Sequence, residues 1–193
     1  MVKPYYRKID SEYENKIDNV IIDSIEEFEK NIFKLNIDPN IVTISRFVLV
    51  VIFWTRFNKT KSKSDALIFG LIYLFNYFLD CLDGYIARKH DRVTILGDLL
   101  DHFADIIGGA LIIYSLYPLK RNETILVILF TYLALAHLGC QQKIYNKGKP
   151  KETLDYLRSM CFTSIKTSKY FSTPIQILVY FFLFCNRFIF SKN

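Results

Sequence analysis

The chain has 193 residues, of which 51% are hydrophobic and 16% aromatic, and its formal net charge is +6. The length fits one domain, but the apolar residues gather in long blocks, which argues against a soluble domain and for a membrane protein. The positive charge suits anionic lipid surfaces, and nucleic acid is not an expected partner because no basic stripe with stacking aromatic residues occurs outside the apolar blocks.

Residues 1–38 form a charged N-terminal arm that differs in composition from residues 39–193. Ser24-Ile-Glu-Glu27 fits a capping box and predicts that a helix begins at Ser24. Four apolar residues follow at helical spacing: Ile25, Phe28, Ile32 and Leu35. They predict an amphipathic helix that lies along the membrane surface or packs on the first span, with a plain packing helix as the alternative. We expect no catalytic residue in the arm, and no cleavable signal peptide because the first 40 residues are polar and charged.

Long apolar blocks follow the arm, each near the roughly 20 residues that a helix needs to cross a bilayer. They run from about Ile41 to Phe57, Ala66 to Ile86, Val93 to Tyr117, Thr124 to Cys140 and Phe171 to Phe190. Residues 152–169 are less apolar and are interrupted by Asp155, Arg158 and Lys166. They are predicted to form a sixth span that lines a cavity, with an interfacial helix as the alternative. The predicted fold is an all-α, multi-pass transmembrane bundle of about six spans with an N-terminal amphipathic helix.

Basic residues near the span ends predict the orientation, because Lys and Arg are retained on the cytoplasmic side. If the N-terminus is cytoplasmic, thirteen Lys and Arg residues near the span ends lie on that side and six on the other. The turn that holds Arg88, Lys89 and Arg92 then faces the cytoplasm.

Three further features bear on packing. The four cysteines lack metal or redox spacing, and the three that lie in or beside predicted spans are interpreted as packing residues. His137 lies inside the fourth span, where an interhelical hydrogen bond is expected, with a place in the acceptor pocket as the alternative. The Gly108-Gly109 pair would allow close approach of helices, so a homodimer stays open.

Four aspartates stand beside or within the second and third spans: Asp80, Asp83, Asp101 and Asp105. Their spacings of three and four residues place each pair on one helix face. The turn between the two spans is short, which predicts antiparallel neighbours whose carboxylate faces converge. Carboxylates are costly in a membrane, and a convergent set of four suggests a site for hard divalent cations. The alternative is a salt-bridge network with the basic residues of the turn.

Small and basic residues share these helix faces. Gly84 leaves space beside the carboxylates, and Arg88, one turn further on, can bind a phosphate through two hydrogen bonds. Gly97 lies on the same face as Asp101 and Asp105. The arrangement therefore suggests that two bound cations could lie between the helices and bridge phosphate oxygens.

Two segments carry a family resemblance. Asp80-x2-Asp83-Gly84-x2-Ala87-Arg88-x8-Gly97-x3-Asp101-x3-Asp105 resembles the signature of the CDP-alcohol phosphotransferase family, with all eight positions matched at the usual spacing. Pro39-Asn40-x2-Thr43-x2-Arg46 is similar to the segment that often opens the first span of that family. The resemblance covers about residues 39–140.

The resemblance implies transfer of a substituted phosphoryl group from a CDP-linked donor to an alcohol, with release of CMP. It implies a two-metal site for Mg²⁺ or Mn²⁺ held by Asp80, Asp83 and Asp101, with Asp105 as the general base and a further ligand. The substrate-binding residues that it implies are Asn40, Thr43, Gly84, Ala87, Arg88 and Gly97. The short chain resembles the members that use CDP-diacylglycerol, so a small polar alcohol would be the acceptor.

Two alternatives stay open. Asp101-His102 resembles the Asp-His pair of the choline- and ethanolamine-phosphotransferase branch, in which the histidine assists as a base; otherwise His102 is an ordinary residue of a helix face. A non-catalytic membrane protein that binds or transports divalent cations is the alternative from another class.

Ile106 stands where members with phosphorylated acceptors often carry a basic residue, which argues against such an acceptor. Asp98 is expected to be exposed or structural.

Overall fold

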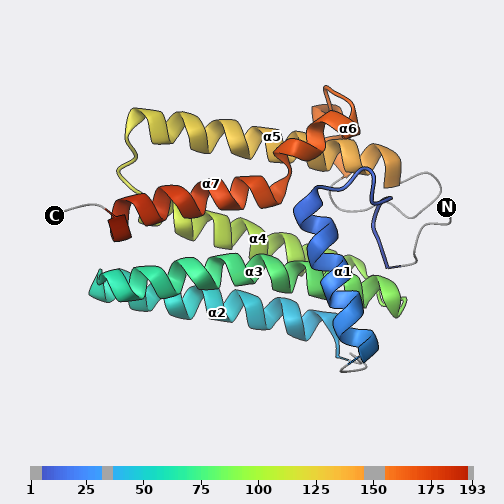
Figure 1. Ribbon diagram of the computed structural model, residues 1–193, viewed down its shortest axis with the longest axis horizontal. Helices are drawn as coiled ribbons and strands as arrows, with labels where there is room; N and C mark the ends of the chain where they lie inside the picture. The colour runs from blue at the N-terminus through green and yellow to red at the C-terminus, as the bar shows by residue number, and fades with distance from the viewer. Residues whose placement is uncertain (1–5, 32–36, 146–154, 191–193) are drawn as a thin grey trace.

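The computed structural model describes residues 6–31, 37–145 and 155–190, and over these ranges the chain is helical without a strand. Five main helices run side by side (Figure 1): α2 (Pro39–Thr60), α3 (Lys63–Lys89), α4 (Ile95–Ser115), α5 (Arg121–Tyr145) and α7 (Thr173–Cys185). Helix α1 (Lys16–Asn31) lies across one end of this bundle. Short helical turns complete the chain: η1 (Asp155–Met160), α6 (Ile165–Ser168), η2 (Lys169–Phe171) and η3 (Asn186–Phe190).

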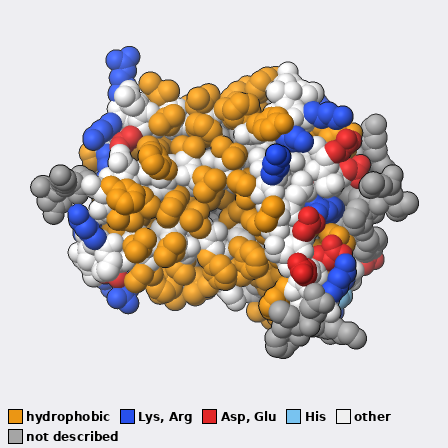
Figure 2. Space-filling model, in the orientation of Figure 1, with side chains coloured by type: hydrophobic (Ala, Val, Ile, Leu, Met, Phe, Trp, Pro, Cys, Tyr) orange, Lys and Arg blue, Asp and Glu red, His pale blue; other side chains and the backbone are white. Residues whose placement is uncertain are grey.

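The bundle has the surface of a membrane protein. Four helical runs are long and apolar enough to cross a bilayer, namely Pro39–Thr60, Lys63–Lys89, Arg121–Ile144 and the run Ile165–Phe190 that contains α6 and α7. Helix α4 runs between the same two ends but carries three aspartates in its first half. Figure 2 shows a broad apolar band across the middle of the molecule, with charged side chains at both ends. The predicted helical membrane bundle is therefore confirmed.

The sixth span predicted over residues 152–169 is not formed. Its described part contains the short turns η1 and α6 instead of a membrane-length helix, and residues 152–154 lie outside the described ranges. A disulfide joins Cys140 of α5 to Cys161, so the interpretation of Cys140 as a packing residue beside a span missed its covalent partner. The disulfide and the close approach of the Leu157 backbone to Gly139 hold the segment against α5.

Helix caps fix the turns that carry the predicted motif. Helix α2 begins after Asp38, whose side chain accepts a hydrogen bond of 2.8 Å from the Asn40 N–H. Thr94 caps α4 in the same way and accepts from the Gly97 N–H at 3.0 Å. Between α3 and α4 the chain reverses at Asp91, which has a left-handed φ of 53°. The short loop therefore makes α3 and α4 antiparallel, as predicted.

The predicted start of the N-terminal helix at Ser24 is wrong. Helix α1 begins at Lys16, where the Asn15 side chain accepts from the Ile17 N–H at 2.9 Å. Ser24 lies inside the helix, and its hydroxyl donates to the Val20 carbonyl at 2.7 Å. Ser and Asp side chains can bond to the backbone within a helix as well as at its start, so the capping-box pattern was ambiguous.

Helix α1 is amphipathic and packs chiefly on α3. Ile22 and Ile25 are buried in a cluster with Tyr85 and Ile86 of α3. Tyr85 donates a hydrogen bond of 2.7 Å to Glu29, which also accepts from Lys89. The predicted face is only partly buried, because Phe28 is 45% exposed, and Ile32 and Leu35 lie outside the described residues. The helix is thus a docked part of the bundle end.

A compact aromatic cluster holds the helices together at the opposite end. The ring of Phe184 in α7 lies 5.1 Å from that of Phe57 in α2 and 5.4 Å from that of Phe69 in α3, centroid to centroid. All three side chains are fully buried. Such aromatic contacts stabilise a bundle by area and by edge-to-face geometry. This cluster leaves the other end of the bundle available for polar residues.

Gly139→Ala should destabilise the protein, because a Cβ on Gly139 would overlap the Leu157 backbone carbonyl in the η1 turn. Overpacking of this kind costs about 1–3 kcal/mol. The matched control is Gly109→Ala in α4, where no atom of the described residues lies within 4 Å of the added Cβ and helix propensity favours Ala by about 1 kcal/mol. Thermal unfolding in detergent should show a lower midpoint for the first variant alone. Equal midpoints for the two variants would contradict the close approach of η1 to α5.

Candidate active site

The four aspartates of the motif converge on one side chain, Arg46 of α2, which is 0% exposed. Its Nη1 donates to Asp105 Oδ1 at 2.8 Å, and its Nη2 lies 3.0 Å from Asp80 Oδ1 and is hydrogen-bonded to Asp101. Its Nε lies 3.3 Å from Asp83 Oδ2. The predicted convergence of the two carboxylate faces is therefore present, with a cation at its centre.

The helices reach this arrangement in a way that differs from the expected one. Helix α2 packs along both α3 and α4, whereas α3 and α4 approach each other only weakly. The two motif helices are antiparallel but are not tightly packed neighbours. The carboxylates face each other across the α2 side chain because buried like charges repel unless an opposite charge lies between them.

The four carboxylates differ in their surroundings. Asp83 is 6% exposed and accepts a hydrogen bond of 2.7 Å from the Thr43 hydroxyl, besides its ion pair with Arg46. Asp101 and Asp105 are more open, with side chains 30% and 45% exposed. The site thus has an enclosed side at Asp83 and a more accessible side on α4.

The donor set fits a hard divalent cation. Asp80, Asp101 and Asp105 each offer one oxygen, and these three atoms lie within 4.8 Å of one another. Carboxylate oxygens are the ligands that Mg²⁺ and Mn²⁺ prefer. One guanidinium cannot balance four carboxylates, so negative charge remains to attract cations. Asp83 stands apart from this trio, where Thr43 and Arg46 hold it.

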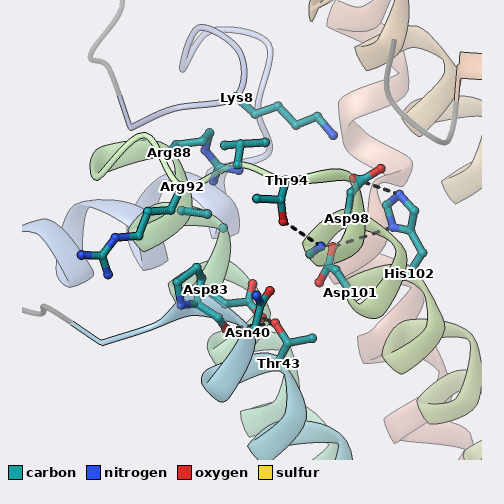
Figure 3. Close-up of a pocket in the computed structure, with 15 residues that line it drawn as sticks. Lys8, Asn40, Thr43, Asp83, Arg88, Arg92, Thr94, Asp98, Asp101 and His102 are labelled. Atoms are coloured by element: carbon teal, nitrogen blue, oxygen red, sulfur yellow. Dashed lines mark hydrogen bonds and ion pairs between the residues drawn. The ribbon is translucent and has the colours of Figure 1, made fainter. Parts of the chain in front are cut away.

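A pocket adjoins the aspartates and is shown in Figure 3. All of the predicted substrate-binding residues line it: Asn40, Thr43, Gly84, Ala87, Arg88 and Gly97. Asp83, Asp101 and His102 also line it. The pocket therefore joins the N-terminal ends of α2 and α4 to the C-terminal end of α3. Its lining does not include Asp80 or Asp105, which contact Arg46.

The two motif glycines allow close packing at this pocket. A Cβ on Gly97 would lie 3.0 Å from Asn40 Oδ1 and 3.1 Å from Thr94 Oγ1. A Cβ on Gly84 would lie 3.0 Å from Arg88 Nη1. Gly97 thus lets the start of α2 approach the start of α4, and Gly84 leaves room for the Arg88 side chain.

His102 and Asp98 form a pair at the pocket wall. His102 Nε2 lies 3.3 Å from Asp98 Oδ1, and its Nδ1 lies 3.7 Å from Asp101 Oδ2. Asp98 is therefore a pocket residue rather than an exposed one. His137 lies elsewhere, buried in α5, where its Nδ1 is 2.9 Å from the Ser168 hydroxyl. That contact between α5 and α6 is the interhelical hydrogen bond that the sequence predicted.

The sequence did not predict Arg46 or several pocket residues as members of the site. Arg46 carried a signal, because it lies within the first apolar block, away from Arg56 near the end of that block, and charged residues in such blocks mark functional sites. Thr94 and Arg92 follow the motif turn and line the pocket. Lys8 also lines it, and nothing in the charged arm distinguishes it from the neighbouring basic residues.

Arg46→Gln should make the protein depend on divalent cations for stability. Removing one partner of a buried ion pair costs about 3–5 kcal/mol, so we expect a lower unfolding temperature in the presence of a chelator. Adding Mn²⁺ should raise that temperature by more in the variant than in the unaltered protein, because the ion replaces the missing positive charge.

The matched control is Arg56→Gln, whose ion pair with Asp65 involves a side chain 62% exposed at the far end of the bundle. The control should respond to Mn²⁺ as the unaltered protein does. A Mn²⁺ response in Arg56→Gln as large as that in Arg46→Gln would argue against the central role of Arg46.

Comparisons with known proteins give several relatives. A probable CDP-diacylglycerol–inositol 3-phosphatidyltransferase of Arabidopsis thaliana is 28% identical over 58% of this chain and 47% of its own length. An archaetidylinositol phosphate synthase of Pyrococcus horikoshii is 25% identical over 69% of this chain and 70% of its own. A CDP-diacylglycerol–glycerol-3-phosphate 3-phosphatidyltransferase of Rickettsia felis is 37% identical over 40% of this chain and 43% of its own.

The match thus covers about half the length of two of these relatives. No solved structure matches the chain. The family model of the CDP-alcohol phosphatidyltransferases matches residues 36–189, which include the whole motif, Arg46 and the pocket residues of α2, α3 and α4. The chain belongs to the CDP-alcohol phosphatidyltransferase family.

Proposed function

We propose that this protein is an integral-membrane enzyme of phospholipid synthesis. It transfers a phosphatidyl group from a CDP-linked donor, CDP-diacylglycerol, to a small polar alcohol and releases CMP. The observation that carries the proposal is the convergence of four aspartates beside a pocket lined by the other motif residues. The family supports the reaction class. The names of relatives from Arabidopsis and Rickettsia support the donor, and they differ in the acceptor.

Each part of the site has a role in this reaction. Asp80, Asp83, Asp101 and Asp105 would hold two Mg²⁺ or Mn²⁺ ions, which when bound would offset the charge of the diphosphate and of the departing CMP. Arg88 can bind a phosphate through its guanidinium. Asn40 and Thr43 offer polar groups to the nucleotide, and the small side chain of Ala87 leaves space in the pocket.

Asp105 is our candidate for the general base. It is the most exposed of the four carboxylates, and the Arg46 Nη1 hydrogen bond of 2.8 Å fixes its orientation. Asp105 would accept the proton of the acceptor hydroxyl while the hydroxyl oxygen bonds to the lipid-bearing phosphorus. The bond from that phosphorus to the bridging oxygen breaks, and its electron pair leaves with CMP.

His102 keeps a second donor under consideration. It lines the pocket next to Asp101, where it is placed to assist as a base. This favours testing CDP-choline or CDP-ethanolamine with diacylglycerol as the alternative substrates. A purely cation-binding or transport protein is less well supported, because such a protein has no use for a pocket lined by Arg88 and the motif glycines.

We also infer that the site lies near the cytoplasmic face. Lys166 and Lys169 contact Glu12 of the arm at the site end, and Arg158 belongs to the η1 turn that packs on α5 near Gly139. Arg187 contacts the carbonyls of Leu116 and Pro118 at the other end. This strengthens the charge asymmetry that sets orientation. The Cys140–Cys161 disulfide lies at the same end, and disulfides are rare in the cytosol. We give the basic residues more weight because they act during membrane insertion itself.

Asp80→Asn and Asp101→Asn should each abolish CMP release, by about a thousandfold or more, because neutral amides hold a divalent cation poorly and leave diphosphate charge unbalanced. The assay uses purified protein, Mn²⁺ or Mg²⁺, CDP-diacylglycerol and a panel of alcohols, with the lipid product identified by mass spectrometry. Asp91→Asn is the matched control, because Asp91 is exposed in the turn beside the site and its left-handed φ of 53° suits Asn.

Full activity of either site variant would refute the site assignment. Release of CMP from CDP-ethanolamine and diacylglycerol, with none from CDP-diacylglycerol, would replace our donor by the alternative one. No release from any CDP-alcohol would overturn the proposed function.

The orientation can be tested with two exposed lysines at opposite ends, Lys16 in α1 and Lys59 in α2. Each is replaced by Cys in a background in which the free cysteines Cys81 and Cys185 are Ser. In intact cells, an impermeant maleimide should label Lys59→Cys and spare Lys16→Cys until the cells are opened. The reverse pattern would place the site outside the cytoplasm, in agreement with the disulfide.

A further inference from the structure

The N-terminal arm reaches the candidate active site. The backbone carbonyl of Tyr6 accepts a hydrogen bond of 2.7 Å from Arg88 Nε. Two residues further on, Lys8 lines the pocket. Figure 3 shows Lys8 extending over the pocket toward Asp98 and His102, while Arg88 approaches from the α3 side. The arm thus contributes a cation of its own and holds a second one.

The backbone on both sides of Lys8 is anchored. Arg7 is 5% exposed and makes ion pairs with Glu14 and Asp23. Ile9 is 1% exposed and packs in a cluster with Cys140 and Ile165. Because both neighbours of Lys8 are buried, its position over the pocket is fixed by the fold rather than by chance exposure of a flexible tail.

The arm is also tied to both walls of the site end. On one side, the Tyr6 ring lies 5.0 Å from the Tyr85 ring of α3, centroid to centroid. On the other side, Asn15 Nδ2 donates to the Lys169 carbonyl at 2.8 Å, and Lys169 Nζ donates to the Glu12 carbonyl at 2.6 Å. The arm therefore bridges α3 and the η2 turn, with Lys8 between the two attachments.

Lys8 and Arg88 bring two cations to one pocket, whose lining also includes the carboxylates of Asp83, Asp98 and Asp101. A phosphate has several acceptor oxygens and can take hydrogen bonds from Arg and Lys at once.

We propose that Lys8 is a substrate-binding residue that contacts a phosphate oxygen of a bound substrate, opposite Arg88. This inference rests on the proposed function for the identity of the substrates. The phosphate belongs either to the diphosphate of the CDP-linked donor or to a phosphorylated acceptor alcohol. In the second case Lys8 would supply, from another element, the positive charge that Ile106 does not provide.

The test compares Lys8→Gln and Lys8→Arg with Lys16→Gln, which alters an exposed lysine of the same arm. The first experiment concerns the donor: binding of CDP and of cytidine to the purified full chain is measured by calorimetry in Mn²⁺. Loss of one charge-assisted hydrogen bond should weaken CDP binding about tenfold or more. Cytidine binding should be unchanged, and Lys8→Arg should retain most of the affinity for CDP.

The second experiment concerns the acceptor. The KM values for glycerol and glycerol 3-phosphate, and for inositol and inositol phosphate, are compared through CMP release. A rise in KM confined to the phosphorylated acceptors would place Lys8 at the acceptor, and a loss of CDP affinity would place it at the donor. If Lys8→Gln has the same CDP affinity and the same KM values as Lys16→Gln, the proposal is wrong. If the unaltered protein releases no CMP, the proposed function fails, while the CDP measurement still decides the role of Lys8.

Discussion

The contact of one buried arginine with four aspartates is the constraint on which the rest of the structure depends. Four carboxylates at the end of a membrane bundle are tolerable only if positive charge lies among them. Arg46 supplies that charge from α2, so α2 must run beside both α3 and α4. The weak direct approach of the two motif helices then leaves space for a pocket at their common end.

The backbone around that pocket supports the same chemistry. Asn40 belongs to the first turn of α2, and Gly97 to the first turn of α4. Helix N-termini carry partial positive charge and favour anions such as phosphate. The C-terminal end of α3 has the opposite polarity, and Arg88 near that end offsets it. The pocket therefore presents positive charge to a phosphate, while the aspartates beside it suit metal ions.

Local periodicity predicted much of this arrangement, and long-range contacts decided the remainder. The block Ala66 to Ile86 became α3, and the three- and four-residue spacings correctly placed the aspartates on facing stripes. The Ser24 prediction failed because Asn15, nine residues earlier, already caps α1, so that Ser24 lies inside the helix. The missing span at 152–169 and the Cys140–Cys161 bond depend on contacts between separate segments, which composition cannot reveal.

The two ends of the bundle are stabilised by different forces, and this bears on function. Phe57, Phe69 and Phe184 form a buried aromatic cluster at one end, where apolar area and edge-to-face packing give stability. At the other end, hydrogen bonds and ion pairs join the arm, α3 and the η2 turn. Satisfied polar networks specify one geometry because each hydrogen-bond donor has few alternative acceptors within reach. The end of the bundle that must position phosphates is therefore the end held by directional hydrogen bonds and ion pairs. The arm contributes several of these contacts.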